Sequence, residues 1–174
     1  MKEKSREDIF FKLYRMPKPD VAPQASNLEP RASCLVPRTL FDPIRKKDVP
    51  ATPEEHVRQA TIRYLLDVVN VPAHLVSVEF GLCAIDPKSD DRVDILVHDF
   101  SNGATLNRPW LLVECKAPGE YTWQALQVQL NRYLKVISPK YVMLALGDSV
   151  RYFALQKDGK SFSKIEKLPF FDQK

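Results

Sequence analysis

The sequence predicts an α/β fold, with a mixed central sheet flanked by helices and preceded by a proline-rich N-terminal arm. Three observations predict it: two segments with apolar residues at helical spacing, several short β-branched segments between turn residues, and an uneven distribution of proline. Of the 14 prolines, most lie within residues 17–53, where they disfavour helices and central strands. We therefore predict an arm over residues 1–51 and one folded domain over residues 52–174.

The arm itself has two parts. Residues 1–15 carry loosely periodic apolar side chains and can form a short helix, whereas residues 16–51 are expected to drape over the domain in extended form or to mediate contacts. Basic residues gather near the end of the arm and in and after the second predicted helix (Arg38, Arg45, Lys46, Lys47, Arg132, Lys135, Lys140). They are candidates to contact phosphate groups, although a solvated charged surface explains them equally well.

The domain begins with a helix. Thr52 is suited to the N-cap, Pro53 to the first helical position, and Glu55 to the reciprocal side-chain contact of a capping box. Apolar residues then recur at intervals of three or four positions, from Val57 onward. Pro72 bounds this helix.

The remaining elements are mainly strands. Segments 74–85, 92–100 and 109–116 predict three strands that pair as a meander, and segment 121–137 has helical spacing. Segment 141–147 is a continuous apolar strand, and segments 150–156 and 161–168 make a closing hairpin around a turn at 157–159. Because the helix at 121–137 crosses over, strand 141–146 is expected to lie parallel to strand 110–115.

The composition sets loose limits on function. A net charge of +4 and a pI of about 8.9 permit an anionic partner without requiring one. The three cysteines include no CxxC pair, so neither a disulfide framework nor a cysteine-based zinc site is indicated. The charged N-terminus is unlike a signal peptide, and no apolar run approaches the roughly 18 residues that span a bilayer. We therefore expect a cytoplasmic protein that does not enter membranes.

Three charged residues on two predicted strands form the candidate site. Asp94 lies between Val93 and Ile95, and Glu114 and Lys116 end the following strand. Residues at i and i+2 of a strand point to the same face, so Glu114 and Lys116 project together. If the two strands are neighbours, Asp94 faces Glu114 across them.

Such a cluster matches metal-assisted hydrolysis. Two facing carboxylates repel each other unless a cation lies between them, and Mg²⁺ or Mn²⁺ prefers oxygen ligands of this kind. We expect Asp94, Glu114 and the Cys115 carbonyl to bind the metal and Lys116 to assist the attacking water and the phosphate. A surface interpretation, in which Lys116 is a solvated lysine paired with Glu114, explains the Glu-x-Lys pattern alone. It explains the apolar flanks of both acids less well, because burial of an unpaired carboxylate is costly.

The run Arg-Val-Asp-Ile-Leu-Val, followed by Leu-Leu-Val-Glu-Cys-Lys, resembles the PD-(D/E)xK nuclease pattern. More closely, residues 40–156 resemble the N-terminal nuclease domain of type I restriction enzyme R (HsdR) subunits, including its first helix and its QxxxY motif (Gln129 and Tyr133). The resemblance implies a restriction-endonuclease-like α/β/α core and Mg²⁺-dependent DNA cleavage by Asp94, Glu114 and Lys116. Val93 stands where the pattern has proline, which need not disturb the metal ligand.

Further residues are candidates to complete this site. The family usually has another acid on the first helix, and helical spacing favours Glu54 over Glu55 because Glu54 shares the apolar stripe. The alternative for either acid is a favourable interaction with the helix dipole. Arg58 can pair with Glu54, contact phosphate or remain solvated. Gln129 and Tyr133 share a helix face and can position DNA or the catalytic strand, or Tyr133 can simply be an aromatic at the core edge.

Two functions remain open at this stage. The first is a metal-dependent DNA endonuclease. The second is a non-catalytic module that keeps the nuclease fold and binds DNA or assembles with proteins. DNA is the expected partner of either, and other restriction-modification subunits or a second copy of the chain are possible partners.

Overall fold

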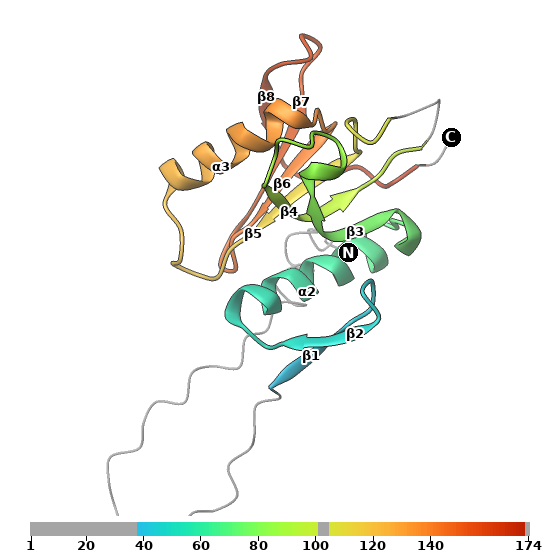
Figure 1. Ribbon diagram of the computed structural model, residues 1–174, viewed down its shortest axis with the longest axis vertical. Coiled ribbons are helices and arrows are strands. Elements are labelled where there is room, and N and C mark those ends of the chain that lie inside the picture. Colours follow the sequence, from blue (N-terminus) through green and yellow to red (C-terminus); the bar gives the residue numbers. More distant parts are fainter. Residues whose placement is uncertain (1–37, 101–104, 173–174) are drawn as a thin grey trace, which may run out of the picture.

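A six-stranded mixed sheet forms the centre of the protein in the computed structural model, which describes residues 38–100 and 105–172 (Figure 1). The strands lie in the order β3-β4-β5-β6-β7-β8. Their bounds are Val76–Gly81 (β3), Arg92–Val97 (β4), Leu111–Cys115 (β5), Tyr141–Ala145 (β6), Val150–Leu155 (β7) and Phe162–Ile165 (β8). The predicted short helix at 1–15 and the arm up to residue 37 lie outside the described residues.

The strand directions follow the predicted topology. Strands β3, β4 and β5 pair as an antiparallel meander, and β6, β7 and β8 continue the sheet in antiparallel fashion. Only β5 and β6 run parallel, since helix α3 (Trp123–Val136) connects them. The sequence prediction of a meander followed by a helical crossover is confirmed.

Two helices cover opposite faces of the sheet (Figure 1). Helix α2 (Pro53–Asp67) packs Val57, Ile62 and Leu65 against one face, and α3 packs Leu126 and Tyr133 against the other. The two cores are therefore separated by the sheet, as in an α/β/α sandwich. The predicted fold class, a mixed sheet flanked by helices and compatible with a restriction-endonuclease-like core, is confirmed.

The start of α2 is as predicted in its backbone but not in one side chain. The Thr52 side chain accepts a hydrogen bond from the Glu55 N–H at 3.1 Å, and Pro53 opens the helix. The predicted capping-box role of Glu55 is wrong, because its buried carboxylate binds Arg45 and Arg58 instead. Two cations are stronger partners for a buried carboxylate than a backbone N–H. The Thr52 N–H donates to the Pro50 carbonyl at 2.9 Å.

The described end of the arm differs from the extended segment that we predicted. Strands β1 (Thr39–Asp42) and β2 (Lys47–Pro50) form an antiparallel hairpin that lies against α2 (Figure 1). The Asp42 side chain makes the turn, since it accepts hydrogen bonds from the Ile44 N–H at 2.8 Å and the Arg45 N–H at 2.7 Å. The folded unit therefore begins before Thr52, earlier than the predicted boundary.

The predicted strand at 74–85 is shorter than expected. Short 3₁₀ turns at Ala73–Leu75 (η1) and Leu82–Ala84 (η2) bound β3. After η2, the chain turns back through the bond between the Ile85 N–H and the Leu82 carbonyl and enters β4. At the other end of the chain, Phe171 returns to the segment just after α2, where its N–H donates to the Val69 carbonyl at 2.9 Å.

Asp42 is expected to fix the hairpin to α2. Its carboxylate is fully buried and accepts bonds from the Arg45 Nε at 2.6 Å and from the Gln59 amide at 2.8 Å. Burial alone would raise the pKa of Asp42, but the hydrogen bonds from Arg45, Gln59 and Ile44 outweigh it and hold the pKa below its ordinary value.

Replacing this carboxylate should destabilise the protein. We expect Asp42→Ala to lower the free energy of unfolding by about 3 kcal/mol at pH 7, because it leaves Arg45 with an incomplete set of partners. Because the pKa of Asp42 is depressed in the folded state, its stabilisation is present above the unfolded value and is lost as the pH falls through the folded value. Urea denaturation at pH 7 and at low pH measures both effects. Exposed Asp48 on β2 is the control, and equal losses from Asp48→Ala and Asp42→Ala would contradict the assignment.

Candidate metal and catalytic site

The candidate site lies where β4 and β5 separate. The ladder between these strands pairs Ile95 with Val113, and Asp94 and Glu114 come directly after that pair. Here the Asp94 side chain replaces a backbone acceptor, because its Oδ2 accepts the Cys115 N–H at 2.7 Å. The carboxylate thus satisfies a backbone donor at the point where the regular ladder ends. Asp94 and the end of β5 are brought together across neighbouring strands, as the sequence predicted.

Glu114 and Lys116 project together from the end of β5. The Lys116 Nζ donates to Glu114 Oε1 at 2.5 Å. Glu114 is only 1% exposed, and its second oxygen, Oε2, is buried without a hydrogen-bond partner among the described residues. A buried carboxylate oxygen normally has a partner, so this oxygen is free to accept a ligand.

The pKa values of Glu114 and Lys116 are both raised, but for different reasons. Burial and the neighbouring Asp94 carboxylate raise the pKa of Glu114 to about 7, although Lys116 acts in the opposite direction. Burial would lower the pKa of Lys116, but the charges of Glu114, Asp94 and Glu54 outweigh it and raise the pKa. Lys116 is therefore held in its charged form beside acids that repel one another.

Arg58 connects α2 to this cluster. Its Nη2 donates to Asp94 Oδ1 at 2.7 Å and to Glu54 Oε1 at 3.0 Å, and its Nη1 donates to Glu55. Burial would lower the pKa of Arg58, but the Asp94 carboxylate more than compensates, and the pKa is raised. Arg58 is only 6% exposed, so its solvated interpretation is wrong.

The two glutamates of the first helical turn differ in position. Glu54 Oε2 lies 3.9 Å from Lys116 Nζ, and the Glu54 side chain is half-exposed. Glu55 is buried on the other side of Arg58, where it meets Arg45 and Gln59. Of these two acids, Glu54 is therefore the one that reaches the end of β5, which agrees with its place on the helical stripe.

The fit to a metal ion rests on two side chains. Within residues 38–100 and 105–172, no group of three or more His, Cys, Asp or Glu side chains is arranged to hold a metal ion. Asp94 and Glu114 nevertheless fit a hard divalent cation, because both are carboxylates, they repel each other, and Glu114 Oε2 has no partner among the described residues. Burial raises the pKa of the Cys115 thiol well above its ordinary value, so Cys115 can contribute only its backbone carbonyl.

Gln129 and Tyr133 lie on the face of α3 that covers the sheet near the site. The Gln129 amide donates to the Tyr133 hydroxyl at 2.5 Å, and that hydroxyl donates to the Arg92 carbonyl at 2.9 Å. Tyr133 is 1% exposed. Burial and the Glu114 charge raise its pKa, so the hydroxyl stays protonated and anchors α3 to the backbone of β4 just before Asp94.

Sequence reasoning missed the charged residues that support Arg58. Arg45 was a candidate phosphate contact, but its side chain is only 15% exposed and binds Asp42, Glu55 and Glu79. Two other basic candidates, Arg132 and Lys140, pair with Asp91 and Asp99. The aspartate-proline pair at 42–43 signals the turn, but no local signal reveals that Arg45 reaches Glu55 on α2.

Comparison with known proteins decides the family. The family model of the type I restriction enzyme R protein N terminus (HSDR_N) matches residues 53–169. The chain belongs to this family. The match runs from the first residue of α2 to beyond β8 and includes the candidate catalytic residues Glu54, Asp94, Glu114 and Lys116. It places the chain among nuclease-related proteins of restriction-modification.

Other comparisons add nothing to this assignment. No curated protein and no solved structure matches the chain. In the part of the chain that the structure describes, neither helix has the length and apolar character needed to cross a membrane.

Arg58 offers a direct test of the charge arrangement. We expect Arg58→Met to lower the free energy of unfolding by roughly 3–5 kcal/mol at pH 7, because the buried Glu55 and the partly buried Asp94 lose their shared cation. Urea denaturation at pH 7 measures this loss. Exposed Arg63 on the same helix gives the control: Arg63→Met should change stability by less than about 0.5 kcal/mol. A loss from Arg58→Met no larger than the loss from Arg63→Met would contradict the arrangement.

Proposed function

We propose that the chain hydrolyses phosphodiester bonds of DNA with the help of Mg²⁺ or Mn²⁺. The observation that carries the proposal is the buried Glu114 carboxylate, which has one oxygen without a partner among the described residues and lies beside Asp94 and Lys116. A nuclease-related family supports the same chemistry. Hydrolysis of a phosphodiester requires an activated water and neutralisation of the charge on the phosphate.

Asp94, Glu114 and the carbonyl of Cys115 are the groups that would hold the metal. When bound, a divalent cation lowers the pKa of a water ligand and offsets phosphate charge. Arg58 and the Cys115 N–H fix the Asp94 carboxylate from two sides. Preorganisation of this kind keeps the carboxylate from rearranging during the reaction.

Lys116 would act directly on the reacting groups. Its ammonium is held at the end of β5 by Glu114 at 2.5 Å and by Glu54 at 3.9 Å. From there it can donate to the attacking water or to a non-bridging phosphate oxygen and stabilise the negative charge of the transition state. Glu54 would orient Lys116 and complete the set of acids.

DNA is the substrate in this proposal, and the family supports a restriction-modification context. We further propose that the chain acts with other restriction-modification subunits. Gln129 and Tyr133 would act as site-supporting residues, because Tyr133 anchors the backbone of β4 that carries Asp94.

Cleavage assays with a lysine variant test the proposal. We expect the protein to cleave plasmid or linear DNA with Mg²⁺ or Mn²⁺ and to lose activity with a chelator. Lys116→Ala should lower the rate by about a hundredfold or more, because a preorganised charge near the phosphate is lost. Lys157→Ala, in the exposed turn before β8, is the matched control and should retain full activity. Metal-dependent cleavage that Lys116→Ala retains would assign the activity to another site or to a contaminant.

Metal binding can be measured without any cleavage. We expect Mn²⁺ titration by calorimetry to show binding by the unaltered protein and at least about tenfold weaker binding by Glu114→Gln, since a neutral amide is a poorer ligand than a carboxylate. Glu120→Gln, an exposed change in the loop before α3, is the control. Equal affinities in Glu114→Gln and Glu120→Gln would remove Glu114 from the metal site.

A second candidate function is a non-catalytic module that binds DNA or assembles with proteins. The observation that favours it is the ion pair of Asp94 with Arg58, which already supplies a cation to one proposed metal ligand. Under this function the protein binds DNA but neither Mn²⁺ nor Mg²⁺. Neither the unaltered protein nor Lys116→Ala then shows metal-dependent cleavage. The calorimetric and cleavage measurements therefore separate the two candidates.

A further inference from the structure

A second region of the same sheet face has the chemistry of a nucleotide-binding site. Leu144 on β6 pairs with Glu114 on one side and with Arg151 of β7 on the other. Residues in register on neighbouring strands point to the same face, so Glu114 and Arg151 share a row. Two strand spacings separate them, which is roughly 10 Å.

Arg151 is a cation without a carboxylate partner among residues 38–100 and 105–172. Its Nε is buried and donates to no described group. The guanidinium instead lies over the Trp123 ring, 4.6 Å from the ring centroid. An arginine held in place by an aromatic ring, with its donors unused, is suited to bind a phosphate group.

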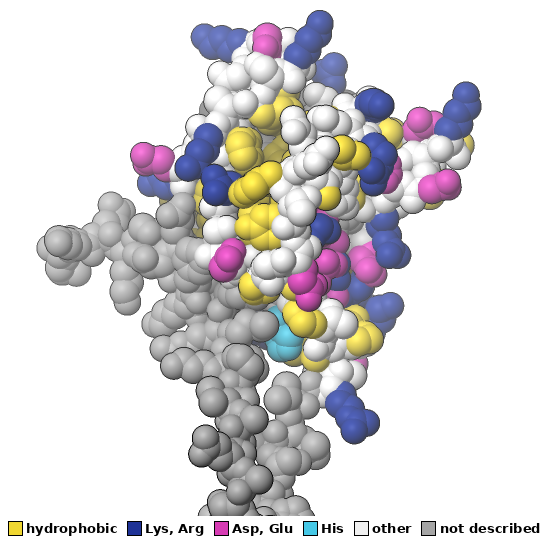
Figure 2. Space-filling view, turned by 90° about the vertical axis from the view of Figure 1, so that its left-hand side faces the viewer, with side chains coloured by type: hydrophobic (Ala, Val, Ile, Leu, Met, Phe, Trp, Pro, Cys, Tyr) yellow, Lys and Arg dark blue, Asp and Glu magenta, His cyan; other side chains and the backbone are white. Residues whose placement is uncertain are grey.

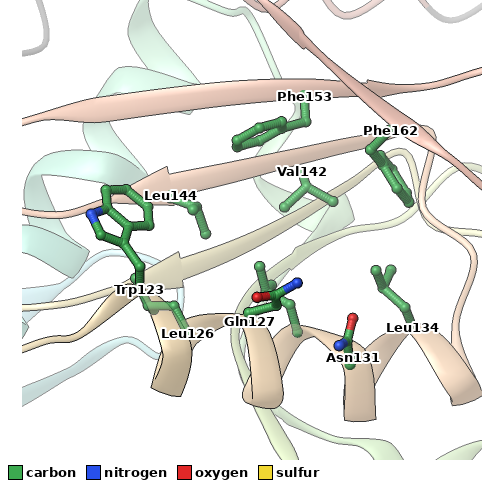
Figure 3. A pocket seen from close by; sticks show the side chains of 10 residues that line it. Trp123, Leu126, Gln127, Asn131, Leu134, Val142, Leu144, Phe153 and Phe162 are labelled. Carbon is green, nitrogen blue, oxygen red and sulfur yellow. The ribbon is translucent and has the colours of Figure 1, made fainter.

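Trp123 also forms one end of a groove between α3 and strands β6, β7 and β8 (Figure 3). The groove has a volume of about 360 Å³. Its apolar wall includes Leu144, Phe153 and Phe162, which lie across from α3. Figure 2 shows apolar side chains gathered on this side of the molecule, with basic side chains near them.

The α3 side of the groove carries two amides. Gln127 and Asn131 lie one helical turn apart and face the aromatic wall (Figure 3). Neither amide makes a hydrogen bond to another described residue. Amide side chains recognise the edges of nucleobases, and aromatic rings stack on their faces. The groove therefore combines what a flat ligand with a polar edge requires.

From these features we infer that the groove binds one unstacked base of the DNA strand, with Arg151 on a phosphate between that base and the Asp94–Glu114–Lys116 cluster. The inference rests on the proposed function, because it places the strand relative to the cluster that would cleave it. The segment 117–122 leads from Lys116 directly to Trp123, so the two sites are joined by a short stretch of chain. The preferred substrate is then DNA with unpaired nucleotides, such as a fork or an overhang.

Binding measurements without metal test this inference. The probes are a fluorescein-labelled DNA fork with unpaired ends and a blunt duplex of the same sequence, in the presence of a chelator and at a fixed salt concentration. We expect the unaltered protein to bind the fork more tightly. Trp123→Ala should reduce the ratio of fork to blunt affinity by about fivefold or more, the lower end of what loss of one base stack produces. Trp123 is 49% exposed, so this change leaves the core intact.

Arg151 variants test the phosphate contact separately. Arg151→Ala should weaken fork binding and reduce the slope of log affinity against log salt by about one. Arg151→Lys should restore most of the salt slope, because it keeps the charge. Arg132→Ala is the matched control, since Arg132 lies on α3 but pairs with Asp91 on the β4 side, and it should leave the fork-to-blunt ratio unchanged.

Three results would overturn the inference: no preference for the fork, a preference that Trp123→Ala retains, or self-association in sedimentation velocity that Trp123→Ala abolishes while DNA binding is unchanged. The last result would assign the groove to a second copy of the chain. Failure of the proposed function gives a different result. In that case the unaltered protein shows no metal-dependent cleavage that depends on Lys116. Fork binding that needs Trp123 and Arg151 supports the groove even in a protein that does not cleave.

Discussion

The Arg58 guanidinium joins α2 to the central sheet, because it donates to Glu54 and Glu55 on the helix and to Asp94 on β4. Without that cation, the buried Glu55 carboxylate and the partly buried Asp94 carboxylate would lose their shared partner in a medium that solvates them poorly. The acidic first turn of α2 can therefore rest on the sheet only with Arg58 in place. Arg45 links the hairpin to α2 in the same way, since it binds both Asp42 and Glu55.

The second oxygen of Asp94 explains how the ladder between β4 and β5 can end next to this residue. It accepts the Cys115 N–H, so the ladder between β4 and β5 ends without an unsatisfied donor. On the other side of β4, Glu79 lies between the pairs Val78–Ile95 and Phe80–Val93 with a φ of 53°. That left-handed conformation costs about 1 kcal/mol or more in a residue other than glycine. The ion pair of Glu79 with Arg45 helps to hold it beside Asp94.

The sequence predicts the parts of this arrangement that depend on local geometry. The same-face projection of Glu114 and Lys116 follows from the period of a strand, and the Thr52 cap follows from the residues after it. The hairpin is missed because the prolines, which disfavour helices and central strands, indicate an irregular arm, whereas Pro43 lies in the turn and Pro50 ends β2. The partners of Glu55 could not be predicted, because Arg45 reaches it only after the hairpin has folded onto α2.

The charges of the network leave room for a cation. The network consists of the ion pairs that Arg45, Arg58, Lys116 and the exposed Arg92 make with six carboxylates. These carboxylates belong to Asp42, Glu54, Glu55, Glu79, Asp94 and Glu114. Negative charge is therefore in excess, and burial together with the Asp94 charge raises the pKa of Glu114 to about 7. Each carboxylate has about four acceptor positions. Asp94 uses two of them and Glu114 one, so a divalent cation could bind both acids while Arg58 and Lys116 keep their contacts. The ion pairs that hold α2 on the sheet and a metal between Asp94 and Glu114 are thus compatible.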